Sequence, residues 1–311
     1  MSHAARPSSA ALPRAERPSR TGPPVGRLYE VNGRKLALHH AGAGGPAVVF
    51  LPGAGLIGLS FLNVQQAAAR FATSVIYDRG GAGWSDPVKL PRSAADAAVE
   101  LRALLGIAEI APPYVLVSHS LGGAHARRFA QLYPTDVAGL VFLDPADERY
   151  AAEPPRSFVD QLKMGLAMAP ALINARRFYR PMFERMFAAW PEALRETLVD
   201  YHVTNWARSL KEAGNLQGEV LPEIAAGGPT PDVPLIVLTA MGIDPFMAPF
   251  MPEAFLRSLN ERKRGYYDAL ARSIPRGENR LVDAGHSTLH TERPDAVVAA
   301  ICDVVAMARA S

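Results

Sequence analysis

Cysteine is almost absent from this chain, which limits how the fold can be stabilised. Cys302 is the only cysteine among 311 residues, so no intrachain disulfide can form. It lies in an apolar run from Val297 to Met307, where a buried, unreactive thiol is expected. Stability must therefore come from packing, and 49% hydrophobic residues suffice for one large core or a core with an inserted lobe.

Long apolar runs are also missing. No segment approaches the roughly 20 uninterrupted apolar residues that a membrane span requires, so no membrane partner is predicted. Residues 1–26 are rich in Ala, Pro, Arg and Ser and lack the apolar stretch of a secretory signal. This composition predicts a disordered N-terminal tail. A soluble, cytoplasmic protein is expected.

Lysine is scarce, since only five of the 33 basic residues are lysines. The net charge of +3 and the isoelectric point near 9.1 come mainly from arginine. No basic stripe interleaved with aromatic residues occurs, so no nucleic-acid partner is predicted. No cluster with metal-ligand spacing is present, and no metal or cofactor is expected. The oligomeric state is left open.

Short apolar runs alternate with longer helical patterns, which predicts an α/β fold. Asn32-Gly33 forms a two-residue hairpin turn between the first two strands. The later runs lack polar alternation, as do strands buried on both faces of a parallel sheet. A hairpin followed by repeated βα units predicts an open, mostly parallel, eight-stranded sheet with helices on both faces. The predicted strands are Arg27–Val31, Lys35–His40, Ala47–Leu51, Thr73–Tyr77, Tyr114–Val117, Gly139–Leu143, Pro234–Thr239 and Asn279–Val282. The predicted helices of this core are Leu59–Phe71, Ser93–Leu105, Leu121–Leu132, Pro252–Ser273 and Pro294–Arg309.

Residues 149–230 interrupt this alternation and contain no convincing strand. An insertion of this length between two strands predicts a helical cap or lid, leaving residues 27–148 and 231–311 as the core. Its predicted helices are Phe158–Met168, Leu172–Ala189 and Pro191–Leu210. A subset of its large apolar residues is expected to line a pocket, and the others to pack the helices together: Met164, Met168, Phe178, Met182, Met186 and Trp190.

The strongest chemical signal is the segment Val117-Ser118-His119-Ser120-Leu121-Gly122, which lies between a predicted buried strand and a helix. This is the setting of a nucleophile elbow, usually Gly-x-Ser-x-Gly. The turn is sharp, so the residues two before and two after the nucleophile must be small. Ser118 replaces the first glycine and Gly122 keeps the second. The segment predicts Ser120 as a nucleophile at a helix N-terminus that favours negative charge.

From the elbow outward, residues 27–309 resemble the α/β-hydrolase superfamily, here a serine esterase or lactonase with a helical cap. Leu51-Pro52-Gly53-Ala54-Gly55 stands where that family has its oxyanion loop, with Pro52 in place of the usual His. The resemblance implies an oxyanion hole made by the backbone amides of Ala54 and Leu121. Tyr77 to Asp86 resembles the family's Arg-Gly-x-Gly-x-Ser loop, which is usually structural.

The predicted general base is His286. Asp283-Ala284-Gly285-His286 follows the last predicted strand and resembles the family's terminal Gly-His segment. Histidine suits the role because it exchanges a proton near neutral pH. His119 adjoins Ser120, and its side chain is expected to point away along the strand. His290 is expected to be packed or solvated.

Two aspartates compete for the role of triad acid. Asp144 ends the strand Gly139–Leu143, whereas Asp244 lies after the next strand, in Met241-Gly242-Ile243-Asp244-Pro245. Asp244 resembles the more common family placement, but it sits one residue further from its strand than that pattern allows. Asp144 resembles hydrolases that place the acid early. We favour Asp144, with Asp244 as the alternative acid.

A rival interpretation rests on Gly53-Ala54-Gly55-Leu56-Ile57-Gly58, which matches the dinucleotide-binding pattern Gly-x-Gly-x-x-Gly, with Asp78 where the ribose-binding acid would stand. It predicts an oxidoreductase. That pattern belongs to the first strand of its fold, whereas a hairpin precedes it here. It also leaves the elbow and the Gly-His segment unexplained.

The favoured prediction is therefore hydrolysis of a carboxylic ester or lactone of a hydrophobic small molecule through an acyl-enzyme. Family members that open epoxides or remove halogens carry Asp in place of Ser120, so those activities are disfavoured. C–C bond, thioester or amide hydrolysis and haloperoxidase-like activity remain alternatives on the same fold.

Overall fold

A computed structural model of the protein describes residues 22–149 and 174–310. Its eight strands form one sheet in the order β1-β2-β4-β3-β5-β6-β7-β8. The pairs β1–β2 and β2–β4 are antiparallel and the other five pairs are parallel, which confirms the predicted, mostly parallel eight-stranded sheet. The strands are β1 (Arg27–Val31), β2 (Arg34–Ala41), β3 (Ala47–Leu51), β4 (Ser74–Tyr77), β5 (Tyr114–His119), β6 (Val137–Leu143), β7 (Leu235–Ala240) and β8 (Gly277–Val282).

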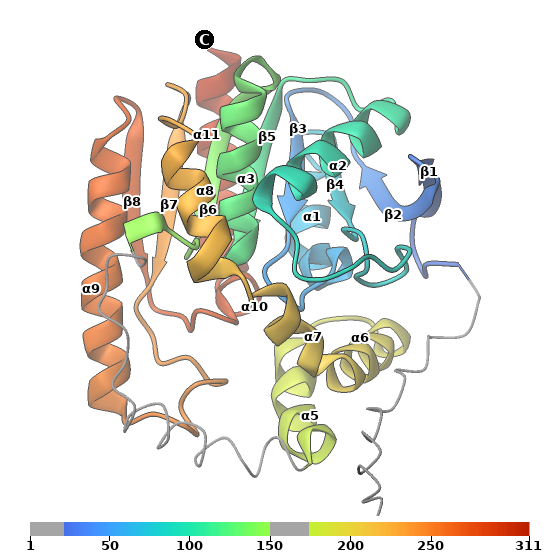
Figure 1. The fold of residues 1–311 in the computed structure, drawn as a ribbon, viewed down its shortest axis with the longest axis vertical. Helices are drawn as coiled ribbons and strands as arrows, with labels where there is room; N and C mark the ends of the chain where they lie inside the picture. Colours follow the sequence, from blue (N-terminus) through green and yellow to red (C-terminus); the bar gives the residue numbers. More distant parts are fainter. Residues whose placement is uncertain (1–21, 150–173, 311) are drawn as a thin grey trace, which may run out of the picture.

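Helices cover both faces of the sheet (Figure 1). Side chains of a parallel strand alternate between the two faces, so Val115 and Val117 of β5 join one core cluster and Tyr114 and Leu116 the other. The first cluster packs beneath α1 (Leu62–Ala68) and α11 (Pro294–Arg309). The second packs beneath α2 (Ala94–Ile107), α3 (Leu121–Leu132) and α9 (Glu253–Arg272).

The first predicted helix is shorter than expected. Residues 59–71 divide into a 3-10 turn, η1 (Gly58–Phe61), and α1. A second 3-10 turn, η2 (Pro134–Asp136), precedes β6, and the short α10 (Leu289–Glu292) precedes α11. Cys302 is exposed on α11, so the expectation of a buried thiol is wrong. Helix α11 is amphipathic, and Cys302 lies on its solvent side rather than among the buried Val297, Ile301 and Val304.

Between β6 and β7 the described residues form helices and turns but no strand. They are α5 (Ala175–Met186), α6 (Glu192–Thr204), α7 (Trp206–Glu212), a π-helical turn η4 (Leu216–Val220), and α8 (Leu221–Ala226). The predicted helix 158–168 lies outside the described residues. The single helix predicted over 191–210 is divided at Asn205 into α6 and α7. Helices α5 to α7 lie together at one end of the molecule (Figure 1), whereas Leu221 and Ile224 of α8 pack against α3.

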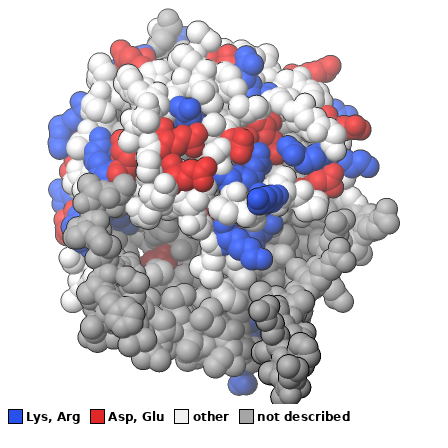
Figure 2. Space-filling model, viewed as in Figure 1, with Lys and Arg blue, Asp and Glu red and all other residues white. Residues whose placement is uncertain are grey.

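The surface carries both signs of charge. On the face shown in Figure 2, acidic and basic side chains are interspersed in a band across the middle. Among the described helices, none combines the length and the apolar character that a membrane crossing requires.

Candidate active site

Ser120 occupies a sharp turn between β5 and α3. Its φ is +50° and its ψ −121°, a conformation that costs a non-glycine residue of order 1–3 kcal/mol. Backbone hydrogen bonds hold it there. The Ser120 amide donates to the Leu143 carbonyl, and the Ser120 carbonyl accepts from the amides of Gly123 and Ala146. Gly122 is required next to the turn, since a Cβ there would lie 2.1 Å from the Leu51 carbonyl oxygen.

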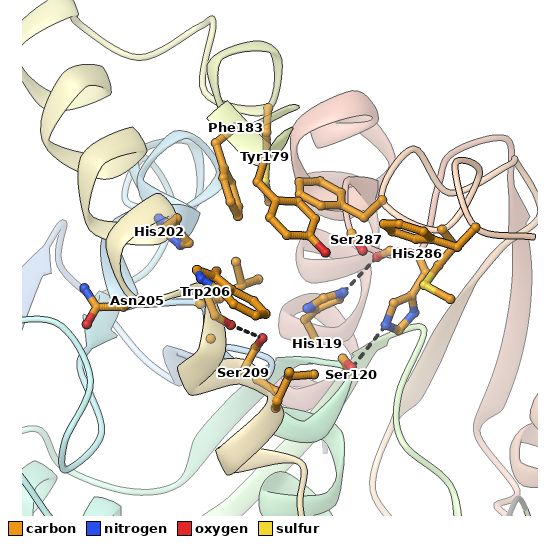
Figure 3. Close-up of a pocket in the computed structure, with 18 residues that line it drawn as sticks. His119, Ser120, Tyr179, Phe183, His202, Asn205, Trp206, Ser209, His286 and Ser287 are labelled. Carbon is orange, nitrogen blue, oxygen red and sulfur yellow. Dashed lines mark hydrogen bonds between the residues drawn. The ribbon is translucent and has the colours of Figure 1, made fainter. Parts of the chain in front are cut away.

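A chain of hydrogen bonds links Ser120, His286 and Asp144. His286 follows β8, and its Nε2 lies 3.1 Å from Ser120 Oγ (Figure 3). Its Nδ1 lies 2.5 Å from Oδ2 of Asp144, which follows β6. The Asp144 carboxylate accepts only, so Nδ1 carries the proton and Nε2 presents its lone pair to the serine hydroxyl. The three predicted side chains are thus brought together from three strand ends.

The Asp144 carboxylate is 1% exposed and fully hydrogen-bonded. Its Oδ1 accepts from the Ala240 amide at 2.9 Å, and its Oδ2 accepts from Lys263 Nζ at 2.8 Å as well as from His286. Burial alone would raise its pKa, but the Lys263 ammonium and the His286 hydrogen bond outweigh burial and lower the pKa to about 2. Asp144 is therefore ionised throughout the physiological range.

Asp244, the alternative acid, makes no hydrogen bond to the His286 ring within the described residues. Its Oδ1 accepts from the amides of Phe246 and Met247, and its Oδ2 accepts from the Ser287 amide at 2.5 Å. Asp244 thus caps the turn after β7 and ties that turn to the backbone next to His286. The geometry favours Asp144 as the residue that contacts the imidazole.

The loop Pro52–Gly55, with Ala54 at its centre, lies against the elbow. A Cβ at Gly53 would lie 3.1 Å from the Ser120 Cβ. Leu121 is the first residue of α3, and first-turn amides have no partner within their helix. The two residues predicted for the oxyanion hole therefore flank the serine on adjoining segments.

A buried ion pair fixes this loop to α7. Arg79 Nη1 donates to the Pro52 carbonyl at 2.7 Å, and Nη2 donates to the Gly53 carbonyl at 2.6 Å. The same guanidinium pairs with Glu212 at 2.8 Å, and Glu212 in turn accepts from the Gly55 amide at 2.6 Å. Both side chains are almost fully buried.

His119 does not point away from the site, so that expectation is wrong. Its ring centroid lies 5.0 Å from that of His286, and its Nε2 donates to the His286 carbonyl at 2.8 Å (Figure 3). Burial, with a smaller contribution from His286, lowers the pKa of His119 to about 4, so its ring is neutral at pH 7. His119 therefore holds the backbone of His286 in place and does not compete with His286 for the role of general base. His290 is fully buried and stacked on Phe61.

A cavity of about 280 Å³ opens onto Ser120 and His286. Helices α5 to α7 and the turn after β7 form most of its wall (Figure 3). Of the expected cap residues, Met186 contributes to the lining; Trp190 instead donates to the Leu59 carbonyl, Phe178 stacks on Phe250, and Met164 and Met168 lie outside the described residues. The aromatic lining residues are Tyr179, Phe183, Trp206, Phe246 and Phe250.

The rival dinucleotide site finds no support in the loop after β3. The Asp78 carboxylate is buried, and it accepts from the Gly58 amide at 2.9 Å and from the Trp84 amide at 2.9 Å. The Asp78 carboxylate is therefore already engaged with backbone amides, in a buried position that does not suit contact with a ribose. In the described part of the chain, no three His, Cys, Asp or Glu side chains gather as a metal site.

Sequence patterns missed three parts of this site. Lys263 lies within the charged segment Asn260-Glu261-Arg262-Lys263-Arg264, which is typical of a solvated helix face. Glu212 was likewise hidden in the predicted cap. The lining residues after β7 carried a visible signal, since Phe246, Met247 and Phe250 cluster in one turn.

Comparisons with known proteins identify the family and the fold. The family model described as the alpha/beta hydrolase family matches residues 48–300. An uncharacterised Bacillus subtilis protein, YbdG, is 26% identical over 142 residues, which are 45% of this chain and 43% of YbdG. The chain thus matches less than half of that relative.

Two solved structures have a similar fold. An enol-lactonase from Burkholderia xenovorans is 18% identical with a TM-score of 0.62, and the match covers 90% of this chain and 99% of the enol-lactonase chain. A thermophilic esterase from Thermogutta terrifontis is 18% identical with a TM-score of 0.56, covering 91% and 99%. At such identities the two structures support the fold alone. The family model covers most of the length of this chain, and that match shows that the chain is a member of the alpha/beta hydrolase family.

Proposed function

We propose that the protein is a serine hydrolase that cleaves a carboxylic ester or lactone of a hydrophobic small molecule. The observation that carries this proposal is the unbroken hydrogen-bond chain from Ser120 Oγ through His286 to Asp144. A hydroxyl is a weak nucleophile on its own, and an adjacent base oriented by a carboxylate activates it. The esterase and enol-lactonase with similar folds add support.

The reaction follows from the positions of these groups. Ser120 Oγ attacks the carbonyl carbon while its proton passes to His286 Nε2. The developing oxyanion lies between the Ala54 and Leu121 amides, at the N-terminus of α3, where negative charge is favoured. Collapse breaks the C–O bond, and His286 returns the proton to the leaving alcohol. Water then attacks the acyl-enzyme by the same route, which releases the acid and restores Ser120.

We further propose that residues 149–230 act as the cap and set the substrate class. The wall formed by α5 to α7 is rich in aromatic side chains, which favours hydrophobic acyl or alcohol groups. In a panel of nitrophenyl esters and lactones of graded acyl size, medium-sized apolar acyl groups should give the highest kcat/KM. A preference for short, charged esters would contradict this part of the proposal.

The nucleophile is tested by covalent labelling. Ser120→Ala should abolish fluorophosphonate labelling and ester hydrolysis without unfolding the chain, since it removes one hydroxyl. Ser118→Ala is the matched control, two residues away on the same segment. Ser118 Oγ is buried and finds no partner among the described residues, so its loss should leave labelling intact and raise the free energy of unfolding by about 1 kcal/mol. Labelling that survives in Ser120→Ala would refute the assignment.

A further inference from the structure

Lys263 shares one oxygen atom with His286. Its Nζ lies 2.8 Å from Asp144 Oδ2, the atom that also accepts from His286 Nδ1 at 2.5 Å. The two nitrogens are thus at most two hydrogen-bond lengths apart. Lys263 is 8% exposed and belongs to α9.

This placement changes the charge balance of the site. A carboxylate beside an imidazole favours the imidazolium, because protonation of the ring then produces a neutral pair. Here the ammonium of Lys263 already neutralises Asp144. A proton on His286 therefore gives the three groups a net charge of +1. Asp144 and Lys263 are buried, so the two cations repel each other more strongly than they would in water.

We propose that Lys263 sets the acid limit of activity, holding Asp144 in place while keeping His286 unprotonated, and hence able to act as a base, at lower pH than the His–Asp pair alone would allow. This inference rests on the proposed function. Lys263 touches neither Ser120 nor the cavity, so it is a positioning residue that acts through Asp144.

The remaining charged and titratable groups around the pair do not replace this ammonium. His119 of β5 is neutral at pH 7. Asp244, after β7, is engaged with backbone amides, and Tyr267 of α9 donates its hydroxyl to the Pro145 carbonyl at 2.7 Å. Glu292 of α10 accepts from the Gly285 amide, and Tyr179 of α5 faces the cavity. Among the described residues, Lys263 is therefore the lysine or arginine that pairs with Asp144.

The decisive variant is Lys263→Gln, because glutamine keeps a hydrogen-bond donor but loses the charge. Lys263→Met removes both, and Lys263→Arg restores the charge. The matched control is Arg264→Gln, the next residue of α9, which is 45% exposed and pairs with Glu261 and Asp268 of the same helix. The measurement is kcat/KM for a nitrophenyl ester from pH 5 to pH 9, with the fluorophosphonate-reactive fraction at each pH.

Lys263→Gln and Lys263→Met should both shift the midpoint of the acid limb upward by about one pH unit. Lys263→Arg and Arg264→Gln should stay within about 0.3 unit of the natural protein. Acid unfolding would also move the acid limb, so the folded fraction of each variant is measured by circular dichroism at each pH and kcat/KM is compared per folded molecule. An acid limb that stays in place in both uncharged variants overturns the inference. Absence of Ser120-dependent activity in the natural protein would instead overturn the proposed function.

Discussion

At the scale of single residues, the site depends on two uncommon backbone conformations. Ser120 has a φ of +50° and Asp144 a φ of +47°, and each follows a buried strand, β5 or β6. Side chains other than glycine avoid this region because Cβ crowds the backbone. The positive φ ends the alternation of side chains between the two faces of the sheet, so both side chains lie at the same edge of the sheet. Strain at adjacent strand ends is thus part of how the serine and the carboxylate reach one imidazole.

Asp144→Asn and Asp244→Asn distinguish the two candidate acids. Asp144→Asn should lower kcat by about ten-thousand-fold with little change in KM, because the amide favours the wrong tautomer of His286. Asp244→Asn should lower kcat by about tenfold at most and destabilise the fold by about 1–2 kcal/mol, since Asp244 holds the Ser287 amide.

Steady-state kinetics and urea unfolding of both variants provide the measurement. If Asp244→Asn were the crippling change and Asp144→Asn remained active, the acid would be wrongly assigned.

The sequence predicted those functional residues that lie in a recognisable local motif. Ser120 stands in a strand–turn–helix segment, and His286 follows a Gly in a strand–loop–helix segment, so both were recognisable. Asp144 followed from a strand end. Lys263 could not be found, because it meets Asp144 across 119 positions and its neighbours along the chain are charged surface residues.

At the scale of elements, the buried ion pair Arg79–Glu212 joins the helical insertion to the loop beside Ser120. One partner follows β4, and the other ends α7. Together they hold the carbonyls of Pro52 and Gly53 and the amide of Gly55. The loop that carries Ala54 is thus held from both sides. We therefore expect that loss of either partner lowers both the rate of ester hydrolysis and the free energy of unfolding.

Glu212→Gln should show this double effect. A buried arginine without its counter-charge destabilises the fold by about 3–5 kcal/mol, and a displaced Ala54 amide should lower kcat by about a hundredfold. Glu184→Gln is the control, because it removes one partner of an exposed pair on α5, which is worth less than about 1 kcal/mol. Thermal unfolding and ester kinetics test both variants. Equal effects in the two variants would contradict a special role for Glu212.

The elements themselves were largely predictable, because buried parallel strands are continuous runs of Val, Ile and Leu. The bounds of β1 and β3 agree with the prediction. The predicted start of α2 is also close, since Ser93 is its N-cap and accepts from the Asp96 amide. The helical insertion was harder. Helix α8 packs against α3, and no local sequence pattern shows this contact. The break at Asn205 between α6 and α7 was not predicted either.

At the scale of the whole molecule, four buried histidines make the fold sensitive to acid. Burial lowers the pKa of His119 and His202 to about 4 and that of His125 to about 3, and it holds the pKa of His290 well below its usual range. Between pH 6.5 and pH 4 the unfolded chain binds protons that the folded chain does not. Each histidine then lowers the free energy of unfolding by about 1.4 kcal/mol per pH unit.

One buried acid opposes this trend. Burial raises the pKa of Asp78 to about 6 despite its two backbone hydrogen bonds, so it adds stability as the pH falls through 6. The histidines outnumber it, and the net loss between pH 7 and pH 5 should be about 6 kcal/mol.

Urea unfolding at both pH values measures this loss, and His125→Gln should reduce it by about a quarter. A free energy of unfolding that is flat across this range would show that these rings are protonated in the folded chain.

The Arg79–Glu212 pair also bears on how such a protein can diversify. An insertion between two strands looks like a piece that evolution or an engineer could exchange freely. Here an exchanged insertion would have to supply an acid at the place of Glu212, or the core would retain a buried arginine with no counter-charge. Positions 79 and 212 should therefore change together among relatives, and a chimera that ignores this coupling should fail to fold before its new specificity can be measured.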